Sequence, residues 1–129
     1  MNRIERFEDI IAWQRARALV KEIYSCARAG AFARDFGLRD QIQRASVSVM
    51  SNIAEGYERG GNKEFIQFLS SSKGSCGEVK SHLYVALDQG YIVPAAFEKL
   101  YSAADEVGRL VNGLAAYLRQ SELRGRKFK

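Results

Sequence analysis

The sequence predicts an all-α protein, an antiparallel up-down-up-down four-helix bundle. Apolar residues recur at alternating spacings of four and three along four separate segments, as they do on one face of an α-helix. No segment shows the period-two alternation of a strand, and glycine or proline punctuates the short connections. Helices joined by about two to eight residues lie antiparallel to their neighbours. The 129 residues fit one domain, which we divide into a bundle over 1–120 and a basic tail over 121–129.

Two apolar stripes define the first pair of helices. The first stripe consists of Ala12, Ala16, Leu19, Ile23 and Cys26. The second consists of Leu38, Ile42, Ala45, Val49 and Ile53. The second helix should end near Arg59, because the following glycine pair tolerates positive φ.

A longer pair of helices follows. Asn62 is the expected N-cap of the third helix, Gly90 its stop, and Pro94 the first residue of the fourth. The third stripe consists of Phe65, Leu69, Ser72, Cys76, Val79, Leu83 and Ala86. The fourth consists of Phe97, Leu100, Ala104, Val107, Val111, Leu114 and Leu118. Both stripes should face one core.

Small residues interrupt the third helix over 70–77, which reads Ser-Ser-Ser-Lys-Gly-Ser-Cys-Gly. Each helical glycine costs about 1 kcal/mol relative to alanine, so we expect this run to permit close approach of a neighbouring helix. The facing residues should be Asn52, Glu55 and Gly56. In this interpretation Asn52, Glu55 and Glu78 form a polar network between helices.

The net charge of +5 is concentrated at the C-terminus. Residues 119–129 hold one acidic side chain and five basic ones, namely Arg119, Arg124, Arg126, Lys127 and Lys129. A second cationic stripe lies on the outer face of the first helix, at Arg17, Lys21 and Arg28. Such surfaces attract phosphates, although a tail of this kind can also serve solubility alone. Aromatic and basic residues do not alternate along the chain, so we expect binding by charge without base stacking.

Metal, disulfide and membrane functions are not indicated. Cys26 and Cys76 lie on apolar stripes as reduced thiols, and His82, the only histidine, lacks the companions of a zinc motif. No apolar run approaches the roughly 18 residues of a membrane span, and no export signal begins the chain. We therefore predict a cytoplasmic protein with no cofactor and no bound metal.

Two patterns keep a hydrolase open as an alternative. Ser70 and Lys73 match the Ser-x-x-Lys spacing of penicillin-recognising acylases, with Ser72 also adjacent, but the other motifs of that class are missing. Glu55 and Glu78 are a candidate carboxylate pair on neighbouring helices.

Several short motifs occur along the chain in a fixed order. They are Phe7, Asp9, Trp13, Gly37-Leu38, Gln41-Ile42, Arg44-Ala45, Asn52-Ile53-Ala54-Glu55-Gly56, Glu64-Phe65, Phe68-Leu69, Gly74-Ser75, Glu78 and Gly90-Tyr91-Ile92. In this combination they resemble the four-helix-bundle family of 23S rRNA intervening-sequence proteins, which includes the accessory variability determinant proteins of diversity-generating retroelements. The resemblance covers about residues 7–118, and one departure is Met50, where the family commonly has proline.

The resemblance implies a non-enzymatic bacterial protein that forms a homopentameric ring and engages nucleic acid through basic surfaces. In the retroelement branch it also implies a reverse transcriptase partner. Tyr24, Phe68 and Tyr101, outside the main stripes, would be candidates for subunit contacts. Our leading hypothesis is an RNA- or DNA-associated scaffold, and the alternative is an assembly factor that recruits a protein partner.

Overall fold

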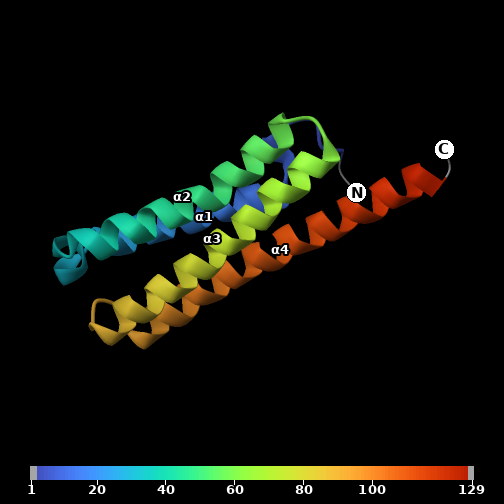
Figure 1. The fold of residues 1–129 in the computed structure, drawn as a ribbon. Helices are drawn as coiled ribbons and strands as arrows, with labels where there is room; N and C mark the ends of the chain where they lie inside the picture. The colour runs from blue at the N-terminus through green and yellow to red at the C-terminus, as the bar shows by residue number, and fades with distance from the viewer. Residues whose placement is uncertain (1–2, 128–129) are drawn as a thin grey trace.

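Four antiparallel α-helices form the molecule in the computed structural model, which describes residues 3–127 and side chains through Ser121 (Figure 1). The helices are α1 (Ile11–Ala27), α2 (Phe36–Glu58), α3 (Asn62–Asp88) and α4 (Pro94–Lys127), with short 3-10 turns at Phe7–Asp9 and Gly30–Arg34. Each helix packs on its sequence neighbours, and α1 also packs on α4. The predicted all-α class and the four helices are confirmed. No β-strand occurs within residues 3–127.

The core follows the predicted stripes. Leu83 on α3 and Ile53 on α2 are fully buried. Leu19 on α1 and Val111 on α4 are each only 1% exposed. Leu114 and Leu118 are only half-buried, whereas Ala115, which the predicted stripe left out, is buried. Beyond this region α4 extends past the ends of the other helices (Figure 1). On α1 the last predicted position, Cys26, is half-buried, and Ala27 takes the buried place. The other assignments hold along the stripes up to Val111.

Glycine and proline set most of the helix boundaries. Gly60 has φ +84° after α2 and Gly90 has φ +73° after α3, conformations that residues with a Cβ rarely adopt. Pro94 begins α4 as predicted. The prediction for Asn62 was wrong: it is the first residue of α3, and the N-cap is Gly61 without a side-chain hydrogen bond. Because Gly60 and Gly61 form the turn between α2 and α3, α3 begins at Asn62, one residue earlier than predicted.

Two hydrogen bonds of Asp35 anchor the connection between α1 and α2. Asp35 caps α2, its Oδ1 accepting from the Leu38 backbone N–H at 3.1 Å. Its Oδ2 accepts from the Tyr91 hydroxyl at 2.9 Å, which joins this connection to the α3–α4 loop. The Tyr91 ring stacks on Phe32, which is buried. The two loops at this end of the bundle are therefore held together.

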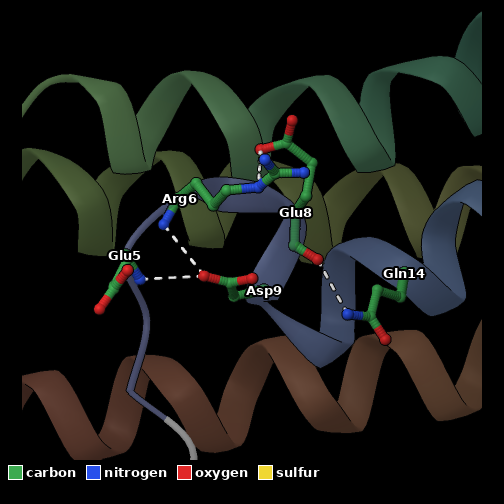
Figure 2. Close-up of polar contacts among 5 residues, drawn as sticks. All are labelled: Glu5, Arg6, Glu8, Asp9 and Gln14. Atoms are coloured by element: carbon green, nitrogen blue, oxygen red, sulfur yellow. Dashed lines mark hydrogen bonds and ion pairs between the residues drawn. The ribbon is translucent and has the colours of Figure 1, made fainter.

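A small polar cluster shapes the N-terminal entry into α1 (Figure 2). The Asp9 carboxylate accepts from the backbone N–H groups of Glu5 and Arg6 at 3.0 and 3.2 Å. The Gln14 side chain donates to the Glu8 carbonyl at 2.8 Å. These bonds fold the segment back, and Phe7 then packs edge-on against Trp13. Asp9 therefore holds this segment by hydrogen bonds, and Trp13 holds it by packing against Phe7.

α2 and α3 approach closely at Gly56 and also at Ser72 of the small-residue run, whose hydroxyl donates to the Val49 carbonyl of α2 at 2.8 Å. A Cβ on Gly56 would lie 2.6 Å from the Cβ of Phe68. Gly74 and Gly77, by contrast, are exposed, and nothing lies within 4 Å of a Cβ placed on either. Within the run only Ser72 and Cys76 are buried. The serines of the run therefore contact α2 as expected, whereas the two glycines take no part in helix contact within the subunit.

Candidate nucleic-acid interface

The predicted stripe on α1 consists of three exposed cations. Arg17, Lys21 and Arg28 all face solvent, and the Arg17 guanidinium lies 6.0 Å from the centre of the Trp13 ring. Their acidic neighbour Glu22 lies 3.8 Å from Lys99 on α4. The three cations of the stripe thus lie on an exposed helix face.

Of the predicted C-terminal cations, the structure describes the side chain of Arg119 only. Arg119 lies on α4 and lines a surface hollow. The helix runs on to Lys127, but the side chains of Arg124, Arg126 and Lys127, and all of Lys129, lie outside the described residues.

A groove lined by several charged residues lies between α3 and α4. It consists of two adjoining pockets of about 470 and 220 Å³ that share Lys73 and Asn112. We call it the α3–α4 groove. Among the described residues that line it, four are cationic and one is anionic, namely Lys73, Lys80, Arg109 and Arg119 against Asp105.

Asp105 organises the cations around it. Its Oδ1 lies 2.6 Å from Lys80 Nζ and its Oδ2 lies 3.3 Å from Arg109 Nε. The hydrogen bond from Lys80 lowers the pKa of Asp105, and the same bond raises the pKa of Lys80. All three groups are charged at neutral pH, so the lining residues carry an excess of three positive charges. Lys73 Nζ contacts only a neutral oxygen in the groove, Asn112 Oδ1 at 3.4 Å.

Glycine keeps part of the groove floor open. Gly77 and Gly113 line it, and a Cβ on either would meet nothing within 4 Å. Exposed glycines inside helices reduce stability by about 1 kcal/mol each without an evident packing reason in the subunit. Because Gly77 and Gly113 have no side chains, another molecule can approach the backbone of α3 and of α4 at these positions.

Aromatic side chains adjoin the groove where Lys80 lies. The Lys80 ammonium is 5.1 Å from the centre of the Tyr101 ring, and Tyr101 is in edge contact with Tyr84 at 5.9 Å between ring centres. Sequence reasoning missed this cluster and expected aromatic and basic groups to be separate. The available signal was helical spacing: residues 73, 77, 80 and 84 share one face of α3.

The polar motif residues on α2 and α3 divide into internal and surface positions. Asn52 donates to the Ser48 carbonyl at 2.8 Å, and Ser48 Oγ lies 2.9 Å from Ser75 Oγ across the helices. Asn52 therefore reaches α3 only through Ser48, and neither serine belonged to the predicted network. Glu55 and Glu78 do not join these hydrogen bonds, because both are exposed and contact Arg59 and His82 of their own helices.

The candidate hydrolytic groups form no nucleophile–base pair. Ser70 and Lys73 both line the α3–α4 groove, but the Lys73 ammonium donates to Asn112 Oδ1 at 3.4 Å. Ser72 is buried and donates to the Val49 carbonyl at 2.8 Å, which occupies its hydroxyl in helix packing. Glu55 and Glu78 have separate partners at 2.8 and 3.5 Å and form no pair. Burial raises the pKa of the Cys76 thiol to about 11, so it is protonated at neutral pH. Both cysteines are free.

Two other kinds of site are absent from the part of the chain that the structure describes. No group of three or more His, Cys, Asp and Glu side chains is placed to hold a metal ion. None of the described helices is long and apolar enough to cross a membrane.

The fold and motifs define a class, the antiparallel four-helix bundles with a polar helix–helix groove. A family model of the 23S rRNA-intervening sequence proteins matches residues 8–113, and the chain belongs to that family. Its fold is similar to the crystal structure of a protein of unknown function from the S23 ribosomal protein family of Bacteroides thetaiotaomicron. The two share 18% identity with a TM-score of 0.74, over 81% of this chain and 98% of the other. No curated protein gives a significant match.

Proposed function

We propose that this protein is an oligomeric, non-enzymatic scaffold that binds the phosphate backbone of nucleic acid in the α3–α4 groove. One observation carries the proposal: four cations surround a hollow that contains a single carboxylate among its described lining residues. The family description, which names a 23S rRNA intervening sequence, is consistent with a nucleic-acid context.

Electrostatics favour this location over the α1 stripe. Cations that converge on a hollow act together on one bound strand, whereas a row on a helix face presents them singly to solvent. Neutralising phosphates releases counterions, so the affinity should fall linearly with the logarithm of salt concentration. The charged contacts identified here carry no base readout, and sequence preference should be weak.

Self-association is the second part of the proposal. Phe36 and Val93 are 64% and 65% exposed, and the Tyr91–Asp35 hydrogen bond brings their two loops to the same end of the bundle. Large apolar side chains grouped in this way favour contact with another protein surface. We propose a ring of identical subunits, with five as the number that the resemblance implies. Tyr24, Phe68 and Tyr101 are half-buried within the subunit and are weaker candidates for this contact.

The same apolar end supports the alternative function, recruitment of a protein partner. A reverse transcriptase is the partner that the resemblance to accessory variability determinant proteins implies. This alternative gains weight if the protein is oligomeric and folded yet binds no nucleic acid.

A titration of fluorescent oligonucleotides over a range of salt concentrations tests the proposal. We expect binding by the parent that weakens steeply with salt and varies little among sequences, together with a ring in light scattering. Two variants examine the other cationic surfaces: deletion of 121–129, and Arg17→Glu combined with Lys21→Glu. Lack of binding at low salt would refute the nucleic-acid function, and binding lost only with the α1 variant would move the site to α1.

A further inference from the structure

A cluster of three rings continues the α3–α4 groove toward the α3–α4 loop. Tyr84, Phe97 and Tyr101 have ring centres 4.9 to 5.9 Å apart. Phe97 is buried, whereas Tyr84 is 51% exposed. The buried ring supports Tyr84 from one side and leaves the rest of its surface accessible. Aromatic surfaces of this kind are the platforms on which unpaired bases stack.

Lys80 joins the aromatic cluster to the cations. Its ammonium lies 5.1 Å from the Tyr101 ring centre and 2.6 Å from Asp105 Oδ1. Asp105, the opposing carboxylate, also contacts Arg109, so two cations offset its repulsion of phosphate. The cationic groups and the aromatic rings therefore lie next to one another along α3 and α4. Asp105, the carboxylate between them, is paired with cations.

The dimensions suit a short strand. From Tyr101 to Arg119 α4 rises about 27 Å, and from Lys73 to Tyr84 α3 rises about 16 Å. Such a length accommodates on the order of four nucleotides, the lower end of known single-strand sites.

We infer that the groove selects single-stranded over duplex nucleic acid, with a base stacked on Tyr84 while phosphates lie along Lys73, Arg109 and Arg119. This inference rests on the proposed function and names its substrate class. Bases in a duplex are already paired and stacked, so Tyr84 can gain nothing from them. A single strand offers both free base faces and phosphates.

The test uses a ten-nucleotide strand of mixed sequence as DNA and as RNA, and the corresponding DNA duplex, at one salt concentration. We expect both single strands to bind roughly tenfold or more tightly than the duplex. Tyr84→Leu should weaken single-strand binding by roughly 5- to 150-fold, the effect of losing one stacked base, and leave duplex binding unchanged. The salt slope should not change, because no charge is removed. Tyr84→Phe should retain tight binding.

Tyr117→Leu is the matched control. Tyr117 is an exposed tyrosine like Tyr84, but it belongs to α4 and lies beside Tyr57 and Leu114, outside the lining of the groove. The Tyr117→Leu variant should bind single strands as tightly as the parent. A second readout needs no variant: 2-aminopurine placed within the DNA strand should lose fluorescence on binding to the parent, since stacking quenches it.

The outcomes separate this inference from the proposed function. If Tyr84→Leu binds single strands as tightly as the parent, or if the duplex binds at least as well as the single strand, the stacking inference is overturned and backbone binding stands. Unchanged 2-aminopurine fluorescence in the bound state would overturn it as well. If neither strand nor duplex binds at low salt, the proposed function fails first and the inference falls with it.

Discussion

Gly56 on α2 and Phe68 on α3 meet so closely that a Cβ on Gly56 would lie 2.6 Å from the Cβ of Phe68. The obstructing atom is attached directly to the α3 backbone and cannot rotate away. Gly56→Ala should therefore separate the two helices and reduce stability by about 1 to 3 kcal/mol. Urea unfolding of both proteins measures the difference. Equal midpoints and slopes would show that the helices do not pack at this spacing.

Leu83 tests the register of α3. Its side chain is fully buried between helices. Leu83→Ala should reduce the free energy of unfolding by about 2 to 5 kcal/mol, through lost transfer energy and a cavity. Tyr84→Ala, one residue further and half-exposed, provides the comparison and should cost less. A reversed order of the two effects would contradict the assigned register.

Gly77 should show opposite effects on stability and binding. It is exposed on α3 in the groove, with open space where a Cβ would lie. Gly77→Ala should raise stability by about 0.5 to 1 kcal/mol, because alanine favours a helix, and should weaken nucleic-acid binding by narrowing the groove.

Gly74→Ala is the control for Gly77→Ala. Gly74 is equally exposed and open but does not line the groove. It should gain similar stability and keep the affinity of the parent, as measured by thermal unfolding and oligonucleotide titration. Equal affinity in both variants would remove Gly77 from the binding surface.

The Lys80–Asp105 pair should make stability depend on pH. The pKa of Asp105 in the folded protein is below its ordinary value of 3.8, so the contribution of the pair is present above that value. It is lost as the pH falls through the folded pKa of Asp105. The pKa of Lys80 is raised above 10.5, so in alkali the contribution is lost only as the pH rises through that raised pKa. The stability difference between the parent and Asp105→Asn should be constant near neutral pH and shrink in acid, and a difference that grows in acid would contradict the pairing.

Much of the fold could be predicted because local periodicity reports burial directly. Leu83 and Ile53 are buried because each occupies the core-facing position of a continuous 4-3 pattern. Gly60, Gly90 and Pro94 act through their own backbone preferences, which do not depend on distant residues.

The parts that failed depend on how helices pack against each other. A glycine in a helix can face a neighbour, as Gly56 does, or solvent, as Gly74 does, and propensity is the same in both cases. Lys73 and Arg109 come together only through the register between α3 and α4, and so do Lys80 and Tyr101. The single chain could therefore indicate cationic helix faces but not the groove that gathers them.

The most direct measurement of the central claim is the salt dependence of oligonucleotide affinity after two groove charges are removed. Lys73→Gln with Arg109→Gln should weaken binding and reduce the slope of log K against log salt by roughly 1.4 to 1.8, about 0.7 to 0.9 for each lost phosphate contact. The matched double variant, Lys63→Gln with Arg44→Gln, removes the same charge from exposed positions on α3 and α2 that do not line the groove. It should leave the slope close to that of the parent. If the two double variants lose affinity and slope equally, binding follows net charge alone, and the α3–α4 groove is not the nucleic-acid site.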